Sequence, residues 1–374
     1  MSSDFPVSPQ FRNPPSWAEI LGRAPARSAE LRISAAAGAR ILVTGAGGFI
    51  GSAIVRAFAA SGAEQTVLLD ICEQHLFEVN AALAAQGYAD RCTPILGSVC
   101  DRALLDALFA EHRPQIILHA AALKHVPLME QNPLAAVATN TLGTAILAEA
   151  AESHGAGQMI LVSTDKAVAP HSIMGASKRI AEQIMLAPSG LRKTAVRLVN
   201  VIGSPCSVAP LFAEQIAHGG PVTVTHPAAS RYFLTLEEVT ALLAEAIEAE
   251  ATGLLIPTPE VTGDPILIAD LARRMIARSG RDVPIVFTQP RPGEKRDESL
   301  VAPAEIIGEP ASPSLTRVKS PVAAGLSTHL QALESALTAR DHAEVLRLGQ
   351  RLVADYQPSE LLRGSVGEPL AVRS

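Results

Sequence analysis

Two short stretches of the sequence contain side chains that could transfer protons. Thr164, Asp165 and Lys166 follow an apolar run that predicts a strand, so they should lie at the carboxyl edge of a sheet, where ligands bind in open α/β folds. A carboxyl group beside an amine can serve as acid and base for one substrate; an ion pair on a surface turn is the simpler alternative. Met174 and Lys178 are four residues apart and share a face of the next expected helix. Met174 itself can neither give nor take a proton.

A glycine-rich stretch, VTGAGGFIGSAIV, separates the first expected strand from the first expected helix. Gly45, Gly48 and Gly51 permit a tight turn and a close approach of the backbone to a pyrophosphate, and the helix N-terminus supplies N–H groups and a positive dipole end. Asp70 ends the second expected strand, nineteen residues beyond Gly51, where a carboxylate binds ribose hydroxyls and repels a 2′-phosphate. The pattern therefore predicts NAD rather than NADP. A tight turn with a surface aspartate is the alternative.

The stretch HAAALKHVP follows the fourth expected strand. The small residues Ala120, Ala121 and Ala122 would let the backbone approach a cofactor closely, and Lys124 and His125 would then project from the carboxyl edge of the sheet. For His125, a helix-capping or packing role is an equally good interpretation.

Composition narrows the class of protein. A chain of 374 residues with 48% hydrophobic and 18% charged residues can bury a large core, and it has room for one large α/β domain with a smaller partner. A net charge of −6 without a basic run argues against nucleic acid as a partner. We expect a reduced, cytoplasmic protein with no metal site, because the four cysteines lack CxxC or disulfide-like spacing. The residues concerned are Cys72, Cys92, Cys100 and Cys206.

Neither a membrane span nor an export signal is expected from the sequence. No stretch reaches the roughly 18 consecutive apolar residues of a span, and the nearest, 134–148, contains threonines, an asparagine and a glycine and predicts a buried helix. The N-terminus lacks the basic-then-apolar pattern of a signal peptide.

Apolar runs alternate with helical patterns over the first half of the chain. The runs expected to form strands are 40–45, 65–70, 93–99, 115–121, 159–164 and 194–200. The helical patterns between them are 49–61, 73–86, 101–111, 133–154 and 172–187. Near-continuous apolar strands suit a parallel sheet buried on both faces. The alternation therefore predicts an α/β protein with a doubly wound parallel sheet, the Rossmann arrangement.

The second half of the chain predicts a smaller lobe. Short helices at 208–218 and 235–250 are mixed with proline- and glycine-rich loops, and residues 257–320 show little continuous strand. The expected division is an N-terminal extension that is partly disordered (1–38), an NAD-binding domain (39–200), an interleaved substrate-binding lobe (201–325) from which one helix and strand return to the first domain (235–258), and C-terminal helices with a tail (326–374).

Several motifs occur in the order that a known family shows. They are HAAALKHVPLMEQNP, NTLGT, STDKAV, MGASKRIAE, VTHPAASRYFLT and RPGEK. Together they resemble the UDP-N-acetylglucosamine 4,6-dehydratases of capsule and polysaccharide biosynthesis, within the extended short-chain dehydrogenase/reductase superfamily. The similarity runs from about residue 17 to about residue 360. WAEILGRAP also resembles the segment that precedes the catalytic domain in the long, membrane-anchored members, so the chain is similar to their catalytic part.

The resemblance gives roles to the proton-transferring residues. Most of the superfamily has a tyrosine at the position of Met174, but the long family members are similar to this chain in having methionine. The resemblance implies that Thr164, Asp165 and Lys166 carry the acid–base work and that Lys178 binds the cofactor ribose. Lys166 would then have to be neutral near pH 7, which burial and the nearby charge of Lys178 would favour.

The resemblance also implies two sets of binding residues and an assembly. For NAD they are Gly45, Gly48, Phe49, Ile50, Gly51, Asp70, Ser98, Val99, Ala120, Ala121, Ala122 and Lys178. For the UDP-sugar they are Lys124, His125, Asn200, Arg231, Arg291 and Glu294, although each taken singly could be a surface ion pair. The helices 133–154 and 172–187 resemble those of a four-helix interface, so a homodimer or a higher form built from it is expected.

The chain departs from the family pattern near the expected sugar nucleotide. Ala169 replaces an asparagine, Val199 replaces a glycine, and Pro205 with Cys206 replaces an arginine and a glycine. These differences affect the choice of sugar or nucleotide rather than the cofactor. The function predicted is the NAD-dependent 4,6-dehydration of a UDP-N-acetylhexosamine. The alternatives are a 4-epimerase, or other 4-keto chemistry on a related nucleotide sugar, and a non-catalytic NAD-binding regulator.

Overall fold

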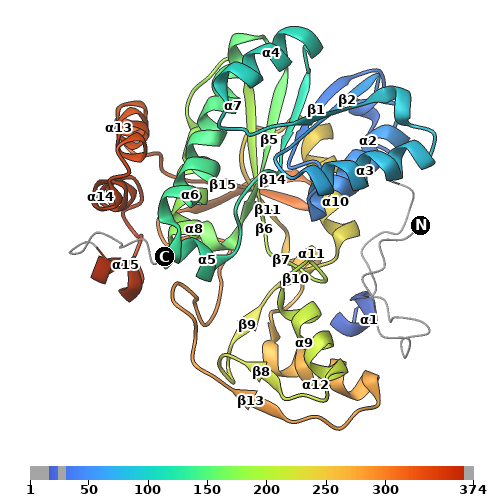
Figure 1. Cartoon of the computed structure of the whole chain (residues 1–374), viewed down its shortest axis with the longest axis vertical. Coiled ribbons are helices and arrows are strands. Elements are labelled where there is room, and N and C mark those ends of the chain that lie inside the picture. Colours follow the sequence, from blue (N-terminus) through green and yellow to red (C-terminus); the bar gives the residue numbers. More distant parts are fainter. Residues whose placement is uncertain (1–16, 24–30, 366–374) are drawn as a thin grey trace.

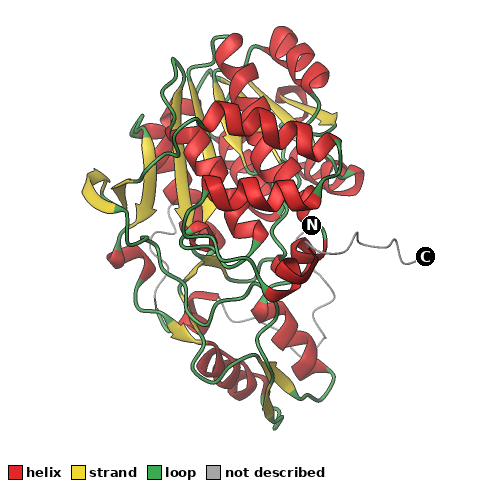
Figure 2. Ribbon diagram, turned by 90° about the vertical axis from the view of Figure 1, so that its left-hand side faces the viewer, coloured by secondary structure: helices red, strands yellow, loops and turns green. Residues whose placement is uncertain are grey.

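The computed structural model describes residues 17–23 and 31–365. Its main part is a nine-stranded sheet covered by helices on both faces, and a smaller lobe lies at one end (Figure 1; Figure 2 shows the same parts after a quarter turn). The strands in spatial order are β14 (Ile306–Ser312), β15 (Leu315–Lys319), β11 (Gly253–Pro257), β6 (Arg192–Leu198), β5 (Gln158–Thr164), β4 (Ile116–His119), β1 (Arg40–Thr44), β2 (Gln65–Asp70) and β3 (Cys92–Leu96).

The predicted doubly wound parallel sheet is confirmed. All six strands expected in the first half of the chain are present and pair in parallel, so their carboxyl ends lie at one edge of the sheet. One face is covered by α2 (Phe49–Ala60), α3 (Glu73–Ala85) and α10 (Leu236–Glu248), and the other by α4 (Arg102–His112), α7 (Gly143–Ser153) and α8 (Ile173–Leu186). Each face buries its own apolar cluster, as continuous apolar strands require.

The expectation that residues 257–320 hold little regular strand is wrong in one place. Residues 306–319 form the hairpin β14–β15, which pairs antiparallel with β11 and extends the main sheet rather than the lobe. The register shifts beside Pro310, which lies on the edge strand β14. A proline is tolerated at a sheet edge because it has no N–H to leave unpaired. The prolines of this region argued against a strand in the sequence, and β14 was therefore not predicted.

The smaller lobe has its own apolar core. It consists of α1 (Trp17–Leu21), α9 (Val208–Ala217) and α12 (Ile268–Ser279), with the short strand pairs β8 (Val222–Val224) and β13 (Ile285–Phe287), and β9 (Ser230–Arg231) and β12 (Ile266–Leu267). Two further strands, β7 (Asn200–Val201) and β10 (Phe233–Leu234), pair next to the carboxyl edge of the large sheet. They connect the lobe to that edge.

One helical stretch, Pro133–Ser153, is long and apolar enough for a membrane span by composition. In the structure 67% of its most apolar window is buried inside the protein. This matches the prediction of a buried helix for residues 134–148. The stretch consists of α6 (Pro133–Val137), a π-helical turn (Ala138–Leu142) and α7.

One of the two helices expected at a dimer interface, α8, is covered by the chain itself. Every residue of α8 from 173 to 185 is buried. α14 (His342–Leu352) packs on α8, and the side chain of Gln183 donates to Leu352 O (2.8 Å) and accepts from Ala323 N (2.7 Å). Within the single chain α8 therefore has no uncovered face, and the homodimer expected through residues 133–154 and 172–187 stays a prediction.

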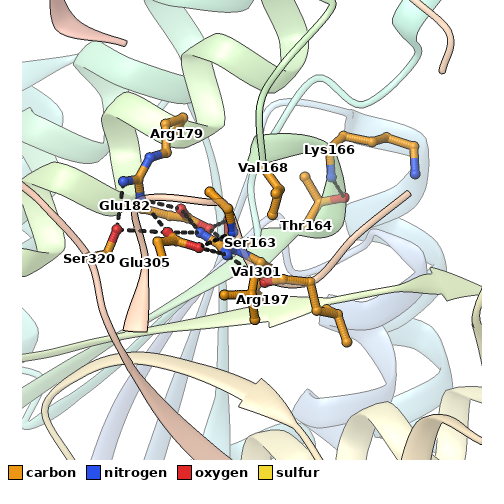
Figure 3. Close-up of polar contacts among 12 residues, drawn as sticks. Ser163, Thr164, Lys166, Val168, Arg179, Glu182, Arg197, Val301, Glu305 and Ser320 are labelled. Atoms are coloured by element: carbon orange, nitrogen blue, oxygen red, sulfur yellow. Dashed lines mark hydrogen bonds and ion pairs between the residues drawn. The ribbon is translucent and has the colours of Figure 1, made fainter. Parts of the chain in front are cut away.

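A buried charge network joins the strands to the last third of the chain (Figure 3). Arg197 on β6 is fully buried and contacts Glu182 of α8 (2.7 Å) and Glu305 (2.8 Å). Arg179 contacts the same two carboxylates, at 3.1 and 3.2 Å. Burial alone would lower the pKa of Arg197. The carboxylates of Glu182 and Glu305 outweigh burial and raise that pKa. Arg197 in turn helps to lower the pKa of Glu182 and of Glu305, so the guanidinium and both carboxylates are charged.

Arg197→Met tests this network. Removing one partner of a buried ion pair leaves carboxylates without full compensation, so we expect a loss of about 3–5 kcal/mol in the free energy of unfolding, measured by urea denaturation. Arg273→Met is the control, because Arg273 pairs with Asp270 at the surface. Exposed pairs contribute less than about 1 kcal/mol. Equal urea midpoints for the two variants would contradict the interpretation.

Candidate active site

The loops after β1 and β4 meet backbone to backbone at the carboxyl edge of the sheet. Gly45 has φ +65°, and a Cβ added there would lie 2.7 Å from Ala121 N. A Cβ added at Gly51 would lie 2.0 Å from Gly45 O. Neither position can hold a side chain, so the glycines are required by the turn itself. Ala120 and Ala121 are half-buried beside it and Ala122 is exposed.

Asp70 holds the glycine turn from the end of β2. Its Oδ2 accepts from Gly47 N and its Oδ1 from Cys72 N, both at 2.9 Å. The residue is only 6% exposed, which excludes the alternative of a free surface aspartate. Phe49 and Ile50 begin α2 directly after Gly48, which has no side chain to cap the helix. The positive end of the helix therefore remains available to an anion.

The loop after β3 lies against the start of α7. Ser98 Oγ accepts from Cys100 N (3.1 Å), and Val99 is buried. A Cβ added at Gly143 would come within 2.7 Å of Val99 Cγ2. The structure thus places Ser98 and Val99 in a closely packed loop next to the sheet edge.

Two buried polar residues that the sequence analysis did not single out fix the neighbouring backbone. Asn140, in the π-helical turn, accepts from Leu123 N (2.8 Å) and donates to Leu123 O (3.0 Å). π-helical turns are often found at functional sites. His119 bridges Thr44 (2.7 Å) and Thr144 (2.9 Å), and burial together with the charge of Lys178 lowers its pKa to about 3. His119 is therefore a neutral structural histidine. Asn140 is the first residue of the motif NTLGT, so the sequence did contain a signal that could have identified it.

Thr164, Asp165 and Lys166 form one hydrogen-bonded group at the end of β5. Asp165 is fully buried, and its Oδ1 accepts from Thr164 Oγ1 and from Lys166 Nζ, both at 3.0 Å. Its Oδ2 is also buried and has no hydrogen-bond partner among the described residues. Lys166 Nζ donates further to Asn200 Oδ1 (3.0 Å). Figure 3 shows Thr164 and Lys166 beside the buried network.

The expected neutral state of Lys166 is not the state that the structure favours. Burial lowers the pKa of Lys166, but the charges of Asp165 and Glu298 and the hydrogen bond to Asp165 outweigh burial and raise it above the ordinary value. The cation that opposes this effect is Arg231, not Lys178 as the sequence analysis assumed. In the resting protein Lys166 and Asp165 are an ion pair.

Glu298 is a member of this group that sequence reasoning missed. Its side chain is 3% exposed and lies 2.7 Å from Lys295 Nζ. Lys295 also donates to Val168 O (2.8 Å), two residues beyond Lys166. The segment that contains RPGEK thus lies along residues 166–168. The motif itself was noticed, but the carboxylate four residues after its Glu294 was not, because only the fold brings it to Lys166.

Lys178 and Met174 lie on α8, next to β5. Lys178 Nζ donates to Val162 O (2.7 Å), and burial, opposed by the charge of Glu182, lowers the pKa of Lys178 to about 8. Met174 is 3% exposed and belongs to the apolar cluster on this face of the sheet. In this protein the position of Met174 serves packing.

Lys124 and His125 lie in the loop between β4 and the next helix. Lys124 Nζ donates to Pro205 O (3.1 Å). His125 precedes α5 (Val126–Gln131), but its side chain makes no capping bond, so the capping alternative is wrong. Burial and the charges of Lys124 and Arg291 lower the pKa of His125. The structure therefore brings these three residues together.

The remaining substrate candidates are bonded within the protein. Arg231 donates to the backbone carbonyls of Lys295 (2.6 Å) and Arg296, and Arg291 pairs with Glu294 at the surface. Asn200 both accepts from Lys166 and donates to Tyr232 O (3.2 Å). Arg231 and Asn200 thus border the acid–base group, whereas Arg291 and Glu294 lie farther out.

The arrangement combines a tight glycine turn with an acid–base pair at one sheet edge. Such an edge can bind a dinucleotide and hold a substrate above the pair. Over residues 17–23 and 31–365 no cluster of three His, Cys, Asp or Glu side chains could hold a metal ion. A carboxylate beside an amine, as in Asp165 and Lys166, can exchange protons with a substrate.

Known proteins show the same fold and family. EpsC of Bacillus subtilis, named a probable polysaccharide biosynthesis protein, is 42% identical over 305 residues, which cover 79% of this chain and 51% of EpsC. The chain thus spans about half the length of this relative. The X-ray structure of Pen from Bacillus thuringiensis superposes with a TM-score of 0.70 and 27% identity, covering 76% of this chain and 89% of Pen.

A further solved structure shows the fold at lower identity. It is DesIV, a dTDP-glucose 4,6-dehydratase of Streptomyces venezuelae, in complex with NAD, with a TM-score of 0.62, 24% identity and coverage of 70% of this chain and 88% of that one. The model of the family described as polysaccharide biosynthesis protein matches residues 41–320. Since that match spans most of the chain, as does the similarity to EpsC, the chain belongs to the polysaccharide biosynthesis protein family.

Proposed function

We propose that the chain catalyses the NAD-dependent 4,6-dehydration of a UDP-N-acetylhexosamine, with UDP-N-acetylglucosamine as the first substrate to test. One observation carries the proposal: Asp165 is fully buried beside Lys166, and one of its carboxylate oxygens has no hydrogen-bond partner among the described residues. Eliminating water needs an acid and a base on adjacent carbons, which a single tyrosine does not provide.

The residues at the sheet edge fit NAD. The turn at Gly45 and Gly51 has no space for side chains, so a pyrophosphate would meet backbone there, and Asp70 at the end of β2 would accept from ribose hydroxyls. Lys178, which reaches β5 from α8, would bind the nicotinamide ribose. A bound NAD would supply hydride transfer, as the acceptor of a hydride from sugar C4 and its donor to C6.

The chain's own residues then handle the protons. Thr164 Oγ1, which donates to Asp165 Oδ1, relays the proton of the C4 hydroxyl to Asp165. The resulting 4-ketone acidifies the C5 proton, and neutral Lys166 removes it. Protonated Asp165 donates to the departing C6 hydroxyl, so water leaves. Asp165 is ionised again once it has given its proton to the leaving water, and Lys166 becomes neutral again when it returns a proton to C5. Each proton taken up is thus given back within one turnover.

Incubation with UDP-N-acetylglucosamine and NAD in deuterated water tests the function. We expect loss of water and one solvent deuteron at C5, detected by mass spectrometry and NMR. Lys166→Ala should lower turnover by about a hundredfold or more, because the C5 base is lost. Lys319→Ala, at an exposed position, is the control.

Other outcomes would identify the alternatives. A 4-epimerase would give a product of unchanged mass with no deuterium at C5. A non-catalytic regulator would bind NAD, turn over none of a panel of nucleotide sugars, and be indifferent to Lys166→Ala.

Gly51→Ala tests the cofactor site. The added methyl group would collide with Gly45 O, so the turn must shift away from the pyrophosphate position. We expect NAD affinity to fall at least about tenfold by calorimetry, equivalent to about 1.4 kcal/mol. In Gly190→Ala the new Cβ would lie 3.4 Å from Glu152 Oε1, an ordinary contact, and NAD affinity should be unchanged. Equal losses in both variants would refute a specific role for Gly51.

Glu298→Gln tests the protonation of Lys166. Because Lys166 must be neutral to act and its pKa is raised, turnover should increase with pH until Lys166 has lost its proton. Removing the Glu298 charge lowers that pKa, so the rising limb should move to lower pH. Glu309→Gln, an exposed change in the same third of the chain, should leave the limb in place. A limb that does not move in Glu298→Gln would exclude this role.

A further inference from the structure

Helix α1 is part of the smaller lobe, where it packs against residues about 190 to 250 positions later in the chain. Ala18, Ile20 and Leu21 are buried there, and Arg274 of α12 donates to the carbonyls of Ile20 (3.2 Å) and Leu21 (3.0 Å). Figure 1 shows α1 beside the lobe formed by α9 and α12. Arg23, two residues after the end of α1, donates to Phe233 O (2.6 Å) in β10. The helix is thus fastened to the lobe at several points.

The side chain of Trp17 covers the backbone of the loop that follows β7. Gly203 in this loop has φ +78°, and a Cβ added there would lie 2.5 Å from Trp17 Nε1 and 2.7 Å from Trp17 Cε2. The indole therefore occupies the space that any side chain at position 203 would need. An indole is a large, rigid surface that loses little conformational freedom when it packs.

The same loop reaches the substrate side of the site two residues later. Pro205 O accepts from Lys124 Nζ at 3.1 Å. Cys206 has φ +58°, and Ser204 N and Ser207 N bond to carbonyls within residues 201–204, so the turn is compact. Trp17 and Lys124 thus act on the loop 202–207 from different elements, one through Gly203 and the other through Pro205.

We infer that Trp17 is a positioning residue for nucleotide-sugar binding: it fixes the loop 202–207, whose Pro205 carbonyl holds Lys124 at the substrate site. The inference rests on the proposed function, because that function assigns Lys124 to the substrate. Helix α1 then stabilises the loop that orients Lys124 at the substrate site. A contact that orients Lys124 acts on substrate binding and leaves the acid–base pair at Asp165 and Lys166 in place.

Steady-state kinetics distinguish this role from general stability. We expect Trp17→Ala to raise KM for the UDP-sugar about tenfold, with kcat within about twofold and NAD affinity unchanged. Trp17→Phe, which keeps a flat ring, should recover most of the loss. Val283→Ala is the matched control, because Val283 is buried in the same lobe core but contacts Gly220. A KM in Trp17→Ala equal to that of Val283→Ala would overturn the inference.

A fluorescence experiment tests the same point without turnover. Trp17 is the single tryptophan of the chain, so intrinsic emission excited beyond the uridine absorption reports on this contact alone. We expect UDP to change the emission of the NAD-saturated wild type with the affinity that calorimetry gives. Calorimetric binding with silent emission would overturn the role of Trp17 and leave the proposed function intact. Failure of UDP to bind the wild type would overturn the proposed function, and the positioning role with it.

Discussion

The burial of Arg197 is the constraint on which the arrangement of the site depends. A fully buried guanidinium must be paired on all sides, and its partners come from α8 and from Glu305, more than a hundred residues later in the chain. Arg197 also donates to Leu300 O (2.6 Å), so the segment before Glu305 is drawn across the end of the sheet. That segment carries Lys295 and Glu298 to the acid–base group. The buried network around Arg197 thus helps to hold the segment that carries Glu298, and the charge of Glu298 contributes to raising the pKa of Lys166.

In the proposed mechanism, the ion pair of Asp165 and Lys166 does the work that a tyrosine does in most of the superfamily. A tyrosine handles one proton, whereas the pair has two ionisable groups held 3.0 Å apart, with Thr164 on the carboxylate. The same proximity stabilises the charged form of the amine. The reactive and the resting protonation states therefore differ, and the pH of the surroundings sets how much of the protein is ready to react.

Local patterns were sufficient to predict the sheet, the glycine turn and Asp70, because strand period and turn chemistry act over a few residues. The same held for Asp165 and Lys166, which adjoin in sequence. Contacts between segments far apart in sequence could not be predicted. The position of Glu298, the packing of Trp17 against Gly203 and the covering of α8 by α14 all depend on the tertiary fold. The protonation of Lys166 was misjudged because burial was counted without its carboxylate neighbours.

The covering of α8 by the C-terminal helices has a consequence for biosynthesis. α8 is complete by residue 186, but α13 (Leu326–Thr338) and α14, which close the layer over this side of the sheet, are made only after a further 140 residues or so. During translation the apolar surface that will face α14 stays open to water or to other chains. The layer that contains Lys178 is therefore completed only when α14 packs on α8.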